Sequence, residues 1–264
     1  MSFSGLSNQT RGLFASGYTP SNSDVIEYVN IASTGNGVDF GNITPAARRY
    51  ASGCSSPTRG ITAGGFTSDY VQTIEFLTIA TLGDTASFGD LTSGKTDVAG
   101  LSSPTRGIFG GGQGPSPSPD TRITAIDFIT IASTGDATTF GDLTEARRGS
   151  ASASDGIRGI FAGGGKAPAG EDTDVIDYIT IATLGNATDF GNLTEPRNRV
   201  AKGQVCNLSR GVFGGGDIAH PGLTVTNKID YVTIQSTGNA TDFGDLLNAI
   251  YDSAGCSDSH GGIS

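Results

Sequence analysis

Few residues in this chain are of the types that carry out catalysis or bind metal ions. The 264 residues include two histidines, His220 and His260, and three cysteines, Cys54, Cys206 and Cys256. Neither histidine has a candidate nucleophile or a second metal ligand near it in the sequence, and the cysteines lack the paired spacing of a zinc site. We therefore expect no catalytic centre, no metal site and no cofactor, and we predict that the protein is not an enzyme.

Glycine-rich strings such as "RGIFAGGG" (residues 158–165) have the composition of phosphate-binding loops. A phosphate loop ends in Gly-Lys-Ser/Thr and opens a helix, and neither feature follows these strings in the sequence. The acidic stretch "GEDTDV" (170–175) lacks the central glycine and the final glutamate of a calcium loop. Both kinds of segment are better interpreted as structural loops and strands.

Arginines and nearby aromatic residues are the best candidates for binding chemistry. Pairs of arginines recur between the repeated units described below, and two interpretations stay open for them: a site for an anion or a glycan carboxylate, or salt bridges between neighbouring units. The candidate binding residues are Tyr18, Arg48, Arg49, Phe66, Tyr70, Arg147, Arg148, Arg197 and His220.

Two sequence motifs, here called phrases, are repeated along the whole chain with the same period. The second phrase has the form "VIDYITIATLGNATDFGNLT" (175–194) and occurs five times. A period of about 50 residues indicates a repeat architecture. The first phrase is an apolar run opened by Arg-Gly, in copies 47 to 52 residues apart that begin at Arg11, Arg59, Arg106, Arg158 and Arg210.

Each repeat contains four short segments that are typical of β-strands. In residues 145–194 these are the small-residue run "RGSASAS", then "RGIFAGGG", "VIDYITIAT" and "TDFGNLT". β-branched and aromatic residues dominate the third segment, and Gly-Asn suits the hairpin turn before the fourth. Four strands repeated every 50 residues predict an all-β fold: a five-bladed β-propeller with four antiparallel strands per blade. The small residues would place the first segment nearest the axis.

The unit resembles the kelch repeat, which has a Gly doublet after its second strand and aromatic residues on its third and fourth strands. The doublets are Gly64-Gly65, Gly111-Gly112, Gly164-Gly165 and Gly215-Gly216. The third-strand aromatics are Tyr28, Phe76, Phe128, Tyr178 and Tyr231. The fourth-strand aromatics, expected to be equivalent core residues, are Phe40, Phe88, Phe140, Phe190 and Phe243. Kelch units usually have Trp on the fourth strand, and this chain has no Trp.

The wording of the repeat, with "RGVFGGG" and the ending "CSDSHGG", also resembles repeat proteins of marine bacteriophages, above all cyanophages. That resemblance implies a structural component of a phage virion, such as a tail, neck or capsid-surface protein, assembled in the host cytoplasm. Its implied partners are other virion proteins, or a glycan or protein on the host surface. A homo-oligomer is possible for such a protein.

The repeats predict a single propeller domain over residues 1–264. Its blades should cover roughly 2–44, 45–93, 94–144, 145–195 and 196–247, while 248–264 form a closing strand or an extra half blade. The first-strand phrase occurs six times, because both ends of the chain match it. Either 248–256 close the first blade beside residues 11–17, or residues 2–8 fill that place and the C-terminal segment pairs with another subunit. We favour the first arrangement, because closure within the chain removes an unpaired strand edge.

One face of the propeller should carry both the links between blades and the loops between second and third strands. These loops vary while the hairpin turns hardly change, so this loop face is the expected recognition surface. Each repeat also has one Arg-Gly pair and one acid on its third strand. We expect the five arginines to form ion pairs with these acids, which are Glu27, Glu75, Asp127, Asp177 and Asp230.

Charge and hydropathy exclude several classes of partner. The formal net charge is -10, so duplex nucleic acid and anionic membranes would be repelled on average. We find no apolar window long enough to span a membrane and no signal peptide. The sequence therefore predicts a non-enzymatic structural or binding propeller. A carbohydrate-binding lectin or adhesin is the alternative, and a propeller enzyme is a more distant one.

Overall fold

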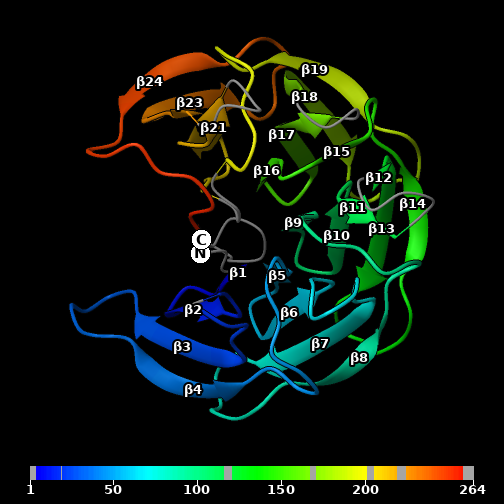
Figure 1. Cartoon of the computed structure of the whole chain (residues 1–264), viewed down its shortest axis with the longest axis vertical. Coiled ribbons are helices and arrows are strands. Elements are labelled where there is room, and N and C mark those ends of the chain that lie inside the picture. Colours follow the sequence, from blue (N-terminus) through cyan, green and yellow to red (C-terminus); the bar gives the residue numbers. More distant parts are fainter. Residues whose placement is uncertain are drawn as a thin grey trace.

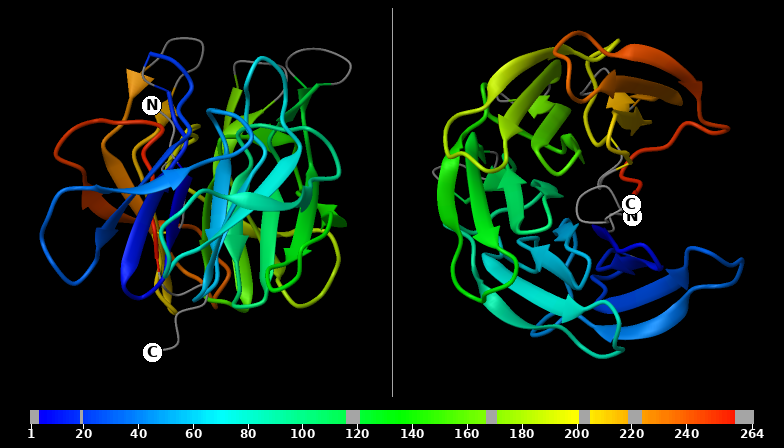
Figure 2. Two further views of the ribbon diagram at one scale, coloured as in Figure 1. Left: turned by 90° about the horizontal axis from the view of Figure 1, so that it is seen from below. Right: turned by 180° about the vertical axis from the view of Figure 1, so that it is seen from behind.

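The computed structural model of the chain describes residues 4–18, 20–115, 121–166, 171–200, 205–218 and 224–257. Within these ranges every regular element is a β-strand, and no helix is long and apolar enough to cross a membrane. The strands form five blades around a common axis, so the prediction of an all-β, five-bladed propeller is confirmed (Figure 1). In the part of the chain that the structure describes, the ring is open on one side, between the first blade and the last (Figure 2).

Blades 1 to 3 are four-stranded antiparallel sheets whose strands follow one another from the axis outwards. Blade 1 contains β1 (Ser4–Ser7), β2 (Arg11–Ala15), β3 (Val25–Asn30) and β4 (Val38–Asn42). Blade 2 contains β5 (Ser52–Ser55), β6 (Arg59–Ala63), β7 (Thr73–Thr78) and β8 (Ala86–Asp90). Blade 3 contains β9 (Ala99–Ser102), β10 (Arg106–Gly110), β13 (Ala125–Thr130) and β14 (Thr138–Asp142), with a ribbon of β11 (Gln113–Gly114) and β12 (Thr121–Arg122) in its loop.

Blades 4 and 5 depart from this pattern at their ends. Blade 4 contains β16 (Ala151–Ser154), β17 (Arg158–Lys166), β18 (Glu171–Thr180) and β19 (Thr188–Asn192), and β15 (Arg147–Arg148) pairs with the extended end of β17. Blade 5 contains β20 (Arg210–Gly214), β23 (Lys228–Thr233) and β24 (Thr241–Asp245), with a ribbon of β21 (Asp217–Ile218) and β22 (Thr224–Val225). On the axial side of β20, Cys206 forms an isolated bridge with Gly211.

The inner strands lie very close together, and this closeness requires small residues. A Cβ atom on Gly100 would lie 2.6 Å from the carbonyl oxygen of Gly53, and one on Gly53 would lie 2.9 Å from that of Gly5. Blade 4 has Ser152 at the corresponding position, and its hydroxyl donates to the carbonyl of Gly100 at 2.6 Å. The expectation that the small-residue strands line the axis is confirmed.

Apolar residues form four clusters, each at an interface between consecutive blades. Between blades 3 and 4, Ile126 and Phe140 of one blade pack with Phe161, Ile179 and Ile181 of the next. Equivalent clusters join blades 1 and 2, 2 and 3, and 4 and 5. Each cluster therefore joins the face of one blade to the next blade, so burial of these apolar residues stabilises the arrangement of the blades as well as each sheet.

The fourth-strand phenylalanines are not all equivalent. Phe40, Phe88, Phe140 and Phe190 are 2 to 4 % exposed, and each meets its third-strand aromatic edge-to-face. Phe243 keeps the contact with Tyr231 but is 54 % exposed, because no further blade covers this side of blade 5 among the described residues. The expectation of five equivalent core residues is therefore wrong for Phe243.

A hairpin turn also binds each blade to the outer edge of the preceding one. In blade 4 the amides of Gly185 and Ala187 donate to the carbonyls of Phe140 and Asp142, at 3.0 and 2.8 Å. The side chain of Asn186 accepts from the amide of Asp142 at 3.1 Å. Gly185 has φ +152°, in the region that favours glycine. The same three bonds join blades 1 and 2, 2 and 3, and 4 and 5, and we call this contact the rim clamp.

The structure corrects the closure that we favoured from sequence. β1 pairs with β2 in the first blade, so Ser4–Ser7 fill the place that we expected residues 248–256 to take. The C-terminal segment up to Ser257 instead lies near the axis between blade 5 and blade 1. The hydroxyl of Ser7 donates to the carbonyl of Ser257 at 2.6 Å, and the hydroxyl of Ser257 donates to the carbonyl of Cys206 at 2.5 Å. A smaller correction concerns blade 4, where the left-handed Gly doublet is Gly163-Gly164.

We expect Phe190→Ala to lower the free energy of unfolding by about 3 to 5 kcal/mol, because it removes a buried ring from an interface between blades. Phe243→Ala, at the same repeat position but half exposed, should cost about 1 kcal/mol. Urea denaturation followed by circular dichroism measures both. Equal losses in the two variants would show that blade 5 is covered in solution.

Candidate functional site

Three of the candidate arginines are buried between blades. Arg48 pairs with Glu75, Arg147 with Asp177 at 2.8 Å, and Arg197 with Asp230 at 2.5 Å. Each cation comes from the link that leaves one blade, and each acid lies on the third strand of the next blade. In these pairs no side chain is more than 2 % exposed, and Lys95 and Asp127 repeat the arrangement between blades 2 and 3. The interpretation as salt bridges that join neighbouring blades applies to these arginines.

Additional hydrogen bonds make these buried pairs tolerable. The hydroxyl of Thr144 donates to Asp177 Oδ1 at 2.6 Å and its amide donates to Oδ2 at 3.0 Å, while Arg147 also donates to the carbonyl of Val175. Burial lowers the pKa of Arg147, and the nearby charge of Asp177 opposes that shift. A buried carboxylate needs this number of donors, since removal from water is costly for each ion.

The arginines of the Arg-Gly pairs do not bind the third-strand acids, so that expectation is wrong. Each guanidinium instead lies over the third-strand aromatic ring of its own blade, as Arg158 does over Tyr178 at 4.5 Å. In blades 1 to 4 it also donates to a backbone carbonyl of the following blade, as Arg158 does to Ile234 at 3.0 Å. Cation–π contacts and carbonyl acceptors therefore take the place of the expected ion pairs.

Four further candidates, Arg49, Phe66, Tyr70 and Arg148, line a cavity of about 450 Å³ on the loop face, which we call the loop-face cavity. Arg49 and Phe66 form an isolated β-bridge there, and Phe66 bridges again to Tyr70. These bridges join a link to a loop between second and third strands, as expected for one shared face. The residues that line the cavity are Arg49, Tyr50, Phe66, Ser68, Asp69, Tyr70, Thr96, Asp97, Gln113 and Arg148.

Arg49 is held by aromatic rings. Its guanidinium carbon lies 4.9 Å from the ring centre of Tyr18, 5.4 Å from that of Tyr50 and 5.2 Å from that of Phe66. Phe66 in turn meets Tyr70 edge-to-face at 5.6 Å. Among the described residues Arg49 has no carboxylate partner within salt-bridge distance. Its charge is therefore oriented by the rings and is not neutralised by a carboxylate of the described chain.

A polar chain forms the other wall of the cavity. The side-chain nitrogen Nε2 of Gln113 donates to the Tyr70 hydroxyl at 2.7 Å, and its side-chain oxygen Oε1 accepts from Arg148. Arg148 lies 3.9 Å from Asp97. The cavity thus combines aromatic surfaces with the Arg49 cation, the Arg148–Asp97 pair, the carboxylate of Asp69 and several hydrogen-bonding groups, a combination that suits a small polar ligand.

The structure brings together five of the nine sequence candidates: Tyr18, Arg49, Phe66, Tyr70 and Arg148. Arg48, Arg147 and Arg197 lie in the salt bridges between blades, and His220 lies outside the described residues. Our sequence reasoning did not identify Tyr50, Asp97 or Gln113. Tyr50 could have been predicted, because it follows Arg49 directly in the sequence. Asp97 and Gln113 could not, because their place in the cavity depends on the way blades 2 and 3 pack.

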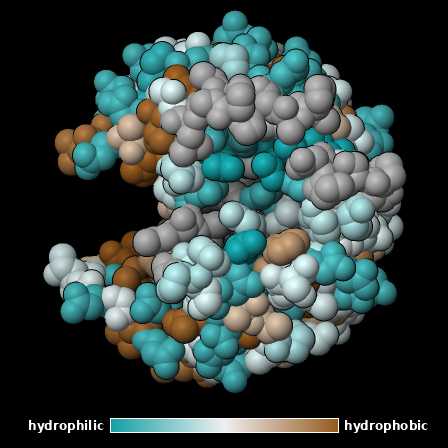
Figure 3. Space-filling view, viewed as in Figure 1, coloured by the Kyte–Doolittle hydropathy of each residue, from teal (hydrophilic) through white to brown (hydrophobic). Residues whose placement is uncertain are grey.

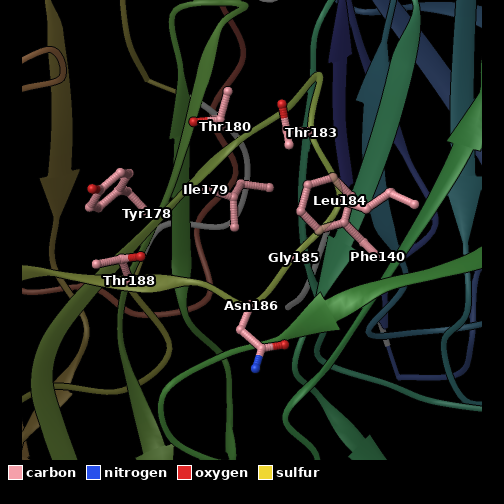
Figure 4. Close-up of a pocket in the computed structure, with 9 residues that line it drawn as sticks. All are labelled: Phe140, Tyr178, Ile179, Thr180, Thr183, Leu184, Gly185, Asn186 and Thr188. Atoms are coloured by element: carbon pink, nitrogen blue, oxygen red, sulfur yellow. The ribbon is translucent and has the colours of Figure 1, made fainter.

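A second cavity, of about 250 Å³, lies at the rim between blades 3 and 4. Figure 4 shows Phe140 of blade 3 beside the turn Leu184-Gly185-Asn186 of blade 4. Its lining contains no charged side chain, and its residues are those of the rim clamp and the blade interface. We therefore assign it to the fold.

The cysteines offer no reactive site in the described structure. All three are free, and burial raises the pKa of Cys54 and that of Cys256. Within the described ranges no group of three His, Cys, Asp or Glu residues could hold a metal ion.

The fold and the loop-face cavity define a β-propeller, a class of protein that fits a binding or structural role. No protein-family model and no curated protein matches the sequence. Among solved structures 323 chains match. One is described as the structure of YjhT, with a TM-score of 0.78 and 10 % sequence identity over 97 % of this chain and 86 % of that chain. At this identity the similarity shows the fold alone.

We expect Asp177→Asn to destabilise the fold by about 3 to 5 kcal/mol, since it leaves the buried Arg147 without a counter-charge. The matched control is Glu27→Gln at the same repeat position in blade 1, where the carboxylate is exposed and has no cation partner in the described structure. That variant should change the free energy of unfolding by about 0.5 kcal/mol or less. Similar losses, measured by urea denaturation, would contradict the role given to the salt bridge.

Proposed function

We propose that the chain is a non-enzymatic binding propeller that recognises a carboxylate-bearing ligand in its loop-face cavity. The observation that supports this best is Arg49, a cation stacked on three aromatic rings without a carboxylate partner among the described residues. A guanidinium confined between aromatic rings is pre-organised for a carboxylate, because less side-chain entropy is lost on binding.

We further propose that the protein is a structural component of a phage virion, and that the loop face contacts another virion protein or the host surface. This part rests on the resemblance of the repeat wording to marine bacteriophage proteins. A rigid propeller with unlike loops on one face suits such a contact, since the blades fix the position of the loops. The localisation proposed is the virion, assembled in the host cytoplasm.

A carbohydrate-binding lectin or adhesin is the second candidate. The rings of Phe66 and Tyr70 lie beside polar groups of Gln113 and Arg148, and sugar rings bind through this combination of apolar faces and hydrogen bonds. An acidic glycan of the host surface would satisfy both this candidate and the carboxylate preference of Arg49.

The binding proposal is tested on an array of glycans that carry sialic acid or uronic acid, with matched neutral glycans and glutamate-rich peptides alongside. We expect saturable binding to carboxylate-bearing probes, and Arg49→Ala should weaken it about 10- to 100-fold, the value of a charged hydrogen bond. Mass spectrometry of purified virions from the producing host checks the virion assignment.

Arg199→Ala is the control. Arg199 is also partly buried on a link, lies over Tyr251 at 5.5 Å, and has Asp217 at 3.6 Å as its carboxylate partner. It should leave the affinity unchanged. Preference for neutral probes, or equal binding by wild type and Arg49→Ala, would reject the carboxylate site.

A further inference from the structure

The open side of the ring has two walls on which apolar residues are exposed whose counterparts in the other blades are buried. Figure 3 shows the hollow on this side, with hydrophobic residues on both of its walls. Because the chain repeats, each wall can be compared with four internal copies of the same surface that are covered. The covered copies show which residues an element between the walls of blade 5 and blade 1 would contact.

Blade 5 forms the first wall. Phe243 is 54 % exposed, whereas its four counterparts are 2 to 4 % exposed. Val212, Ile229 and Leu246 line an apolar cavity of about 300 Å³ together with Ile250. In blades 1 to 4 the residues equivalent to Val212, Ile229 and Leu246 are the core of the interface with the next blade. This wall is therefore half of an interface between blades.

Blade 1 forms the second wall, which is the complementary half. Ile31 is 53 % exposed, while its counterparts Ile79, Ile131, Ile181 and Ile234 are 0 to 1 % exposed against the preceding blade. The two walls thus present the two different sides of the same interface.

The polar contacts of that interface are also incomplete at the gap. Arg210 lies over Tyr231 at 4.6 Å, as its counterparts lie over their rings, but in the described structure it has no carbonyl acceptor of a following blade. The amides of Gly35 and Gly37, which correspond to the donors of the rim clamp, have no acceptor from a preceding fourth strand within the described residues. A further blade would supply both partners.

The inner-strand position of such a blade is already filled by this chain. Residues 254–257 match the inner strands in sequence, and Ser257 completes a belt of hydrogen bonds around the axis. In that belt Ser154 donates to the carbonyl of Ser102, Cys206 to that of Ser154, Ser257 to that of Cys206, and Ser7 to that of Ser257. Because Ser257 stands between Cys206 and Ser7, blade 5 cannot meet blade 1 directly at the axis.

We propose that the open side is a docking site for a three-stranded β-sheet of a partner polypeptide, equivalent to the second, third and fourth strands of one more repeat. The second strand of the partner would pair with residues 254–257, and its hairpin turn would form the rim clamp with Phe243 and Asp245. Its own fourth strand would accept from Gly35 and Gly37. This inference concerns a different surface from the loop-face cavity and does not depend on it.

The charges at the two walls define the partner further. The link of blade 5 has Ile250 at the position of Arg48, Lys95, Arg147 and Arg197, so the partner needs an apolar residue where the other blades have their third-strand acid. On the other wall Glu27 is exposed and occupies the position of that acid. The partner therefore needs a lysine or arginine after its fourth strand to face Glu27.

A second copy of this chain does not meet these requirements. Its own second to fourth strands are enclosed by neighbours in blades 2 to 4, and its open side presents the same two half-interfaces rather than a free sheet. Continuity with the four interfaces inside the chain favours a further repeat over self-association.

The test uses a probe built from the chain itself: residues 155–199 carrying Asp177→Leu, fused after Ser257 in place of residues 258–264 or added as a peptide. Residues 155–157 supply the turn that lets the second strand fold back onto the inner strand, as they do in blade 4. Fusion avoids the need for the peptide to fold alone. We expect hydrogen exchange at the amides of Gly35 and Gly37 to slow about 100-fold in the fusion, to the level of Gly185. The parent probe with Asp177 should protect these amides about 10-fold less, because its acid would face Ile250.

The peptide form allows matched variants of the protein. Phe243→Asp should weaken peptide binding about 30-fold, as expected for a central aromatic of an interface. Ile157→Asp changes an apolar side chain that is 69 % exposed on blade 4, away from the gap, and should leave binding unchanged.

Three results would overturn the inference. Protection of Gly35 and Gly37 in the dilute chain alone would show that the ring closes on itself. Protection that appears only as the chain is concentrated, with a dimer in sedimentation, would assign the surface to a second copy. Unchanged exchange in both the fusion and the peptide mixture would show that no repeat of this kind docks there.

Discussion

The close approach of the inner strands at the axis is the constraint on which the rest of the structure depends. Neighbouring strands are so close that a side chain at Gly100 would overlap the carbonyl of Gly53, and serine hydroxyls bind the carbonyls of the preceding strand. Small residues permit this contact, and the hydrogen bonds fix the angle between successive blades. Once that angle is set, the outer strands, the apolar clusters and the rim clamps must repeat with it.

The repeated interfaces leave the loop face free to vary. Burial of the four acid–cation pairs and of the fourth-strand phenylalanines is settled by contacts between blades, so the loops between second and third strands do not have to contribute to stability. Tyr18, Arg49 and Phe66 come from such loops and from a link, and they form an aromatic site that no other blade repeats in the described structure. A binding site built from the non-repeating residues of a repeat protein can change without loss of the fold.

Much of the fold could be predicted from sequence, because the strands of each blade come from one continuous segment of the chain. The five phrases give the strands, and the small-residue runs give their order from the axis. The partners of charged residues could not be predicted in this way. Arg158 and Asp177 are near each other in the sequence and in the blade, yet Asp177 binds Arg147 from the preceding link and Arg158 binds the carbonyl of Ile234. These choices depend on the neighbouring blade. The exposure of Phe243 has the same cause, since its sequence is that of a core residue and only the missing neighbour makes it a surface residue.

Positions at which one repeat differs from the other four indicate, from sequence alone, where a blade lacks the usual neighbour. Where four links have Lys or Arg, the fifth has Ile250, and where the other links begin with Thr44, Thr92, Thr144 or Thr194, the fifth has Leu247, which is fully exposed. In the inner blades Thr144 and Arg147 together satisfy one buried carboxylate. The link of blade 5 has neither the threonine nor the cation, so a buried acid at this wall would have no hydrogen-bond donor and no counter-charge from the link. The surface there is apolar instead. The replacement of the cation by Ile250 leaves the shape of the interface unchanged but selects the repeat that can dock on it. A repeat with the usual third-strand acid is disfavoured, because a buried acid facing Ile250 would have no counter-charge.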